Sequence, residues 1–146
     1  MQFAEFIRKV SERSGIDEKE ARRRTRAVLN TLGERLGKSL RDKLASEIPR
    51  EMKEFVFGDW GERTNRFDLE DFYTRVVARA GIGYTAAVEE TRCVLSLLKE
   101  SIPRGVMHDI SAELPDEFQE LFGRMPASAL SPTVSEKVCP SEEERK

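Results

Sequence analysis

The sequence predicts an all-α protein: a helical bundle built from two tandem four-helix repeats and followed by a mobile C-terminal tail. Three observations lead to this prediction. Apolar residues recur at helical intervals, no segment sustains the period-two alternation of a half-buried strand, and a long stretch of the chain returns 66 residues later. The octet TRAVLNTL at residues 25–32, for example, returns as TRCVLSLL at 91–98.

The repeat extends well beyond this octet. Residues 3–58 align with 69–124 without a gap, and sixteen of the fifty-six pairs are identical, where chance would give about three. Two such units are too few for a free-standing solenoid, so we expect their apolar faces to bury one another in a single bundle. The predicted organisation is one duplicated domain over 1–125, with repeats at 3–58 and 69–124, a linker at 59–68 and a disordered tail at 126–146.

The first helix of each unit is predicted near residues 3–14 and at the matching place in the second copy. Gly15 ends this helix in the first copy, because a residue of positive φ costs little there. In the second copy Asp68 can cap the helix. Phe67 and Phe72 flank this cap with the spacing of a hydrophobic staple.

The second helix carries the repeated octet as its buried stripe. Asp17 and Glu20 have capping-box spacing at its start, and we expect it to run as far as Gly37. The second copy has GYTA at residues 83–86 in place of this acidic start, so the beginning of its helix should be weaker. Cys93 lies within the octet, and we expect its thiol to be buried and unreactive.

A short third helix and a fourth helix complete each unit. Ser39 is expected to cap the third helix. Pro49 and Pro115 suit the N1 position of the fourth, with Glu51 and Glu117 close to its positive end.

Arg26 and Arg92 lie at the border of the buried stripe, one position after a threonine. We expect each guanidinium to lay its stem on the core and to pair with a repeated glutamate of its own copy. The candidate partners are Glu47 or Glu51 for the first copy, and Glu113 or Glu117 for the second. Thr25 and Thr91 should donate their hydroxyls to the carbonyl of the preceding turn.

The repeated pattern resembles a known family. A Phe-led helix, an Ala/Arg/Glu-rich helix with TRAVL-like residues and a short Ile-Pro or Leu-Pro helix start, all present twice, are similar to the bacterial and archaeal family called domain of unknown function 2267. The resemblance covers about residues 3–125. It implies an all-helical, duplicated module from a prokaryote, with no established activity or active-site residues to carry over.

Composition and motifs narrow the function. The net charge of −2 lacks the basic excess of a DNA-coating protein. No apolar run supports secretion or a membrane span, so we expect a cytoplasmic protein with no membrane partner. The chain has no GxGxxG, P-loop, HExxH or GxSxG motif, and His108 is the single histidine, which we expect at the surface or partly packed. We therefore expect no enzymatic activity, cofactor or metal, and an unrecognised carboxylate site is the least favoured alternative.

The first hypothesis for function is a protein-interaction module that binds another protein or itself. Phe57, Trp60 and Tyr84 are the candidate partner surface, although aromatic residues near the linker also suit core or hinge packing. Residues 1–66 hold sixteen basic and twelve acidic side chains and residues 67–125 hold six and eleven, so the halves carry +4 and −5. This asymmetry favours contact between the halves or head-to-tail association of two copies.

The alternative hypothesis is a weak nucleic-acid or phosphate binder. One basic run supports it, made of Arg22, Arg23, Arg24 and Arg26. The run also suits a solvated helix face on which Glu18 and Glu20 support Arg22 and Arg24 at i,i+4 spacing, and no aromatic interleaving accompanies it.

Overall fold

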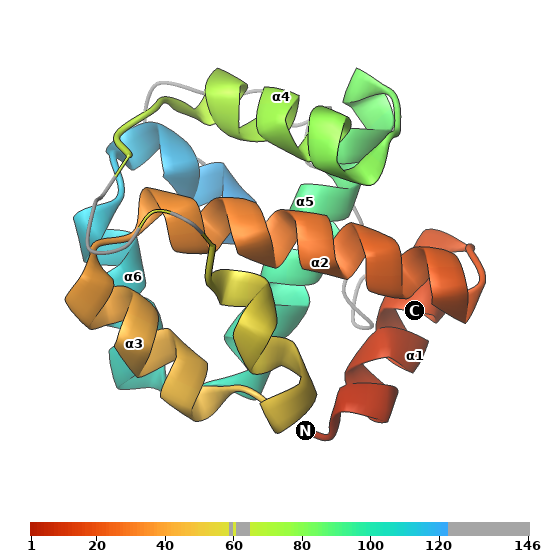
Figure 1. Ribbon diagram of the computed structural model, residues 1–146, viewed down its shortest axis with the longest axis horizontal. Helices are drawn as coiled ribbons and strands as arrows, with labels where there is room; N and C mark the ends of the chain where they lie inside the picture. The colour runs from red at the N-terminus through yellow and green to blue at the C-terminus, as the bar shows by residue number, and fades with distance from the viewer. Residues whose placement is uncertain (59, 61–64, 123–146) are drawn as a thin grey trace.

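The structure is a computed structural model that describes residues 1–58, 60 and 65–122 (Figure 1). This part of the chain contains six α-helices and two 3₁₀ helices and no strand, which confirms the predicted all-α class. The predicted tail at 126–146, and residues 59 and 61–64 of the predicted linker, lie outside the described residues.

The elements of the two halves correspond one to one. The first half contains α1 (Phe3–Ser14), α2 (Glu18–Arg35), α3 (Lys38–Glu47) and η1 (Arg50–Val56). The second half contains α4 (Leu69–Ala80), α5 (Tyr84–Ser101), α6 (Arg104–Glu113) and η2 (Asp116–Phe122). Every element of the second half begins and ends 66 positions after its counterpart, so the alignment of the sequence with itself also aligns the secondary structure.

Local sequence sets several helix ends as predicted. Asp17 at the start of α2 and Asp68 at the start of α4 each accept a hydrogen bond at 2.8 Å from the backbone N–H three residues on. The rings of the predicted staple, Phe67 and Phe72, have centroids 6.2 Å apart. α5 follows Gly83, which makes no side-chain cap, in agreement with the weaker start expected there.

Two predicted helix starts are wrong. α3 begins one residue before Ser39, with Gly37 at its N-cap position, and the Gly37 N–H donates to the Glu113 carboxylate of the other half at 2.7 Å. The fourth element is a 3₁₀ helix in both halves, and Pro49 and Pro115 come immediately before its first residue instead of occupying N1. The carbonyl of each proline accepts from the N–H three residues on at 2.9 Å, which closes a 3₁₀ turn.

The two halves share one core. α2 and α5 pack against each other, α1 contacts both α2 and α5, and α4 also contacts both (Figure 1). α3 lies beside α6 in the same view. Buried apolar side chains from both halves form a single cluster, as expected for two units that cannot each bury their own apolar face.

The predicted threonine hydrogen bonds are absent. Thr25 and Thr91 are fully buried, and neither hydroxyl has a hydrogen-bond partner within the described residues. The same kind of bond does form at Thr31, whose hydroxyl donates to the Ala27 carbonyl at 2.8 Å.

Ion pairs between the halves reveal an approximate two-fold axis. Arg13 of α1 binds Glu100 of α5 at 3.2 Å, and their equivalents Arg79 of α4 and Glu34 of α2 meet at 2.5 Å. Such reciprocal contacts are the mark of an interface with two-fold symmetry. Each half contributes one arginine and one glutamate to these pairs, so they do not depend on the difference in net charge between the halves.

On the axis itself, residues meet their own counterparts. Arg24 binds Glu90 at 3.1 Å and Lys43 binds Asp109 at 3.0 Å, and in both pairs the partners are 66 positions apart. Burial raises the pKa of Glu90, although hydrogen bonds from Ser14 and Arg24 act in the opposite direction. Opposite charges therefore stand where an identical pair of units would bring like charges together.

Gly33 allows η1 to approach α2 closely. A Cβ at this position would lie 2.0 Å from the carbonyl oxygen of Val56, the last residue of η1. The second half has Lys99 at the same position, and its ammonium donates to the carbonyl of Phe122 at 3.2 Å. The 3₁₀ helix is thus held directly on the long helix in the first half and through a lysine side chain in the second.

Gly33→Ala should lower the free energy of unfolding by about 3 kcal/mol, because the new methyl group meets backbone that cannot move without shifting η1. Urea unfolding followed by circular dichroism measures the change. Gly105→Ala in α6 is the matched control, since its Cβ meets nothing within 4 Å and alanine favours the helix by about 1 kcal/mol. Equal losses for the two variants would contradict the close approach.

Glu34 is the most connected of the carboxylates between the halves. Arg75 and Arg79 of α4 lie 3.4 Å and 2.5 Å from it, and the Asn65 side chain donates to it at 2.7 Å. Burial opposes its ionisation, but the hydrogen bonds from Asn65 and Arg79 and the charges of both arginines outweigh burial and hold its pKa below the ordinary value.

Glu34→Gln should cost about 2 kcal/mol of stability at pH 7, because both arginines lose a carboxylate that is largely buried. A lowered pKa contributes stability that is present above the ordinary value of 4.5 and is lost as the pH falls through the lowered one. The stability difference between wild type and variant should therefore shrink below pH 4.5. Urea titrations at a series of pH values test this, and a difference that does not change with pH would show that Glu34 is not the titrating group.

Candidate functional site

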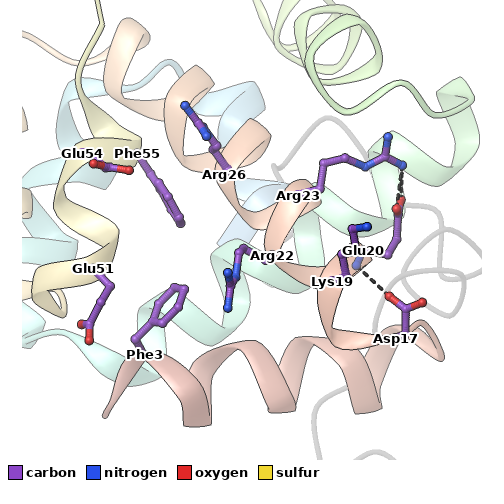
Figure 2. A pocket seen from close by; sticks show the side chains of 10 residues that line it. All are labelled: Phe3, Asp17, Lys19, Glu20, Arg22, Arg23, Arg26, Glu51, Glu54 and Phe55. Carbon is purple, nitrogen blue, oxygen red and sulfur yellow. Dashed lines mark hydrogen bonds and ion pairs between the residues drawn. The ribbon is translucent and has the colours of Figure 1, made fainter.

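A hollow of about 980 Å³ opens between α1, the first turns of α2 and η1 (Figure 2). We call it the first-half groove. Two aromatic rings, four basic side chains and four acidic side chains line it. In Figure 2, Glu51, Glu54 and Phe55 come from η1, whereas Phe3 and Arg22 face one another from α1 and α2.

Aromatic rings and guanidinium groups alternate in the groove. The rings of Phe3 and Phe55 meet edge to face, with centroids 6.2 Å apart. The guanidinium carbon of Arg22 lies 5.4 Å from the centroid of Phe3, and that of Arg26 lies 6.0 Å from the centroid of Phe55. The groove therefore offers apolar contact area and cationic groups side by side.

The structure divides the predicted basic run. Arg23 and Arg24 both bind Glu20, at 2.6 Å and 2.7 Å, and these hydrogen bonds hold the pKa of Glu20 below its ordinary value. Arg24 also reaches Glu90 and does not line the groove. Arg22 and Arg26 do line it, and neither makes an ion pair within the described residues.

The basic groups of the groove are balanced by carboxylates. The four basic residues are Lys19, Arg22, Arg23 and Arg26, and the four acidic ones are Asp17, Glu20, Glu51 and Glu54. Asp17 and Glu20 are engaged at the start of α2, whereas Glu51 and Glu54 are exposed on η1. A groove with unpaired groups of both signs suits a mixed-charge partner better than a polyanion.

The matching surface of the second half is filled by its own side chains. Arg92 donates to the Glu120 carboxylate at 2.5 Å, and the Tyr73 hydroxyl donates to the same carboxylate at 2.6 Å. Tyr73 and Arg92 are both buried, and burial together with the bond to Glu120 raises the pKa of Tyr73. Two leucines, Leu69 and Leu121, replace the phenylalanines of the groove.

These contacts correct the predicted arginine partners. Arg92 does pair with a repeated glutamate, but with Glu120 instead of Glu113 or Glu117, because the Tyr73 hydroxyl holds Glu120 beside it. Arg26 pairs with no glutamate of the described chain and stacks on an aromatic ring instead. Glu51 and Glu117 are both exposed.

The arrangement of Tyr73, Arg92 and Glu120 is incomplete in the first half. Arg26 and Glu54 correspond to Arg92 and Glu120, but Ile7 stands at the position of Tyr73. Without a hydroxyl group to join them, Arg26 and Glu54 are both exposed and form no ion pair with each other. The sequence holds the signal for this difference, a tyrosine in one repeat against an isoleucine in the other, although the contact itself becomes visible only in the structure.

Two residues of the predicted aromatic surface, Phe57 and Tyr84, are 43% and 49% exposed, and within the described residues their rings do not contact each other. Tyr84 meets Tyr73 edge to face at 5.9 Å. The Trp60 ring lies 5.2 Å from the guanidinium carbon of Arg41, which fits the packing alternative for this residue.

The burial of Arg35 and Arg41 was not predicted from the sequence. Arg41 donates to the carbonyls of Gly33 and Leu36 at 2.7 Å and 2.9 Å, and so satisfies the C-terminal end of α2. Arg35 donates to the Phe67 carbonyl at 2.9 Å, and burial lowers its pKa. No periodicity distinguishes these two from surface arginines, and neither has an arginine counterpart in the second half.

His108 lies where it was expected, exposed on α6. It lines a second hollow of about 380 Å³ together with Lys99, Arg104 and residues of α6 and η2. Across the described ranges, no group of three or more histidine, cysteine, aspartate or glutamate side chains could hold a metal ion. In that same part of the chain, no helix combines the length and the apolar character that crossing a bilayer requires.

The two halves provide a matched pair of double-mutant cycles. Arg92→Ala and Glu120→Ala should show a coupling energy of about 1–2 kcal/mol, because the two partners are largely buried and hydrogen-bonded. Arg26→Ala and Glu54→Ala should show no measurable coupling. Urea unfolding of the six variants (four single and two double) and wild type gives both values, and equal couplings would mean that the first-half pair also closes.

A protein-family model matches most of the chain. The model of a family described as uncharacterized conserved protein, DUF2267, matches residues 3–121. No curated protein matches the chain. The match covers nearly all of the described helices and agrees with the resemblance seen in the repeated pattern, so the chain belongs to the domain of unknown function 2267 family.

Proposed function

We propose that this protein is a non-enzymatic, cytoplasmic module that binds a protein partner through the first-half groove. The observation that carries the proposal is the difference between the halves. In the second half, Arg92 and Glu120 bind each other. In the first half, their counterparts Arg26 and Glu54 are exposed and lie beside the rings of Phe3 and Phe55. Aromatic and arginine side chains are the residues most often found at the energetic centre of protein interfaces.

The charges of the groove favour a protein over a nucleic acid. A polyanion would meet Glu51 and Glu54 together with the cationic groups. Arg23 and Arg24, half of the basic run, are already bound to Glu20. Nucleic-acid or phosphate binding through the remaining arginines is therefore the second candidate.

Affinity capture from an extract of the native cell tests the proposal, with wild type, Arg26→Glu and Arg8→Glu as baits. Arg8 is the matched control, because it is an exposed arginine on α1 outside the groove. We expect a defined protein that resists nuclease, is retained by Arg8→Glu and is reduced at least about tenfold by Arg26→Glu, the loss of one charge-assisted contact.

Two outcomes would count against this role. If all three baits retain the same proteins, the groove is not the binding surface. If the captured material disappears after nuclease treatment, or consists of nucleic acid alone, the second candidate takes the place of the first.

A further inference from the structure

The second half shows which chemical group binds beside the paired arginine and glutamate of this fold. In the second half a tyrosine hydroxyl donates to Glu120 while Arg92 binds the same carboxylate. The first half keeps the arginine and the glutamate, as Arg26 and Glu54, and lacks the tyrosine. A phenol that arrived from the groove side could donate to Glu54 and lay its ring beside Arg26 and Phe55.

The chain itself exposes such a phenol. Tyr84, at the first position of α5, is 49% exposed. Tyr73, which its ring contacts, is buried. Tyr84 stands in acidic surroundings, since partial burial and the nearby carboxylates of Glu70, Glu120 and Asp68 raise its pKa.

We propose that Tyr84 of a second copy of this chain enters the first-half groove and donates its hydroxyl to Glu54, so that copies associate head to tail. The inference rests on the proposed role of the groove as a protein-binding site. Complementary groups on both sides support it. Lys19, Arg22 and Arg26 of the groove make no ion pair within the described residues and can meet the carboxylates of Glu70, Glu120 and Asp68 near Tyr84, while the Tyr84 hydroxyl supplies a donor for Glu54. The charges of +4 and −5 on the two halves act in the same direction.

The contact is heterologous, because the groove belongs to the first half and Tyr84 to the second. Each pair of associated copies leaves one groove and one Tyr84 unused, so further copies can add until a ring closes or the chain of copies ends. This property separates the proposal from a symmetric dimer, in which both copies would use the same patch.

Sedimentation velocity at low salt, over concentrations up to roughly 1 mM, tests the proposal with complementary variants. Wild type should give a weight-average mass that rises with concentration beyond a dimer. Tyr84→Ala alone, and the groove variant Arg26→Ala/Glu54→Gln alone, should remain monomeric. A mixture of the two should form a one-to-one dimer and nothing larger, because only one intact groove and one intact tyrosine are left. This recovery on mixing also demonstrates that both variants are folded.

Matched substitutions locate the contact. Phe57→Ala and Arg8→Ala, which change an exposed aromatic and an exposed arginine outside the contact, should associate as wild type does. Tyr84→Phe keeps the ring and should weaken association roughly tenfold, the loss expected for a hydrogen bond to a charged acceptor. Raising the salt to about 1 M should also weaken association.

Three results would overturn the inference. They are a wild type that stays monomeric throughout, variants that associate as strongly as wild type, or a mixture that forms no dimer. The proposed function would still stand if Arg26→Glu abolished capture of a different protein. Self-association that persists in every groove variant would reject this contact, whatever the capture experiment shows.

Discussion

The fold depends on the packing of α2 against α5 around an approximate two-fold axis. Neither half can bury its apolar stripe alone, so the long helix of each half is covered by the first helix of both. The reciprocal pairs of Arg13 with Glu100 and of Arg79 with Glu34 lie on either side of this axis. A two-fold arrangement fixes where every other element is placed, because α3 and α6 and the two 3₁₀ helices follow the long helices in the same order.

Within this symmetric frame, the two halves use the same positions differently. The arginine after the buried threonine is buried and paired with a carboxylate in one half, and in the other it is exposed and lies over the ring of Phe55. Three differences between the halves account for much of this. Ile7 of the first half corresponds to Tyr73 of the second, and Phe3 and Phe55 correspond to Leu69 and Leu121. A surface that is closed by the protein's own side chains in one repeat thus remains open in the other, and the fold is unchanged because none of these residues alters a helix end.

Much of the architecture was predictable from the sequence because it depends on local rules. Asp17, Asp68 and the staple of Phe67 with Phe72 act within one helical turn, and the 66-residue repeat placed both copies of each element. The partners of Arg92 and the hydroxyls of Thr25 and Thr91 were not predictable, since tertiary packing selects them. The first-half groove could not be predicted from the sequence either, because its two rings come from α1 and η1, which are far apart in the chain.

The opposite charges on the axis have a consequence for how the chain assembles. If one half met an identical half, Arg24 would face Arg24 and Lys43 would face Lys43, and the other half would bring Glu90 and Asp109 against themselves. The charges on the axis therefore favour packing of a first half against a second half over packing of two like halves. Contact between like halves of two chains would therefore bring like charges together at these two positions, whereas contact between a first half and a second half pairs opposite charges.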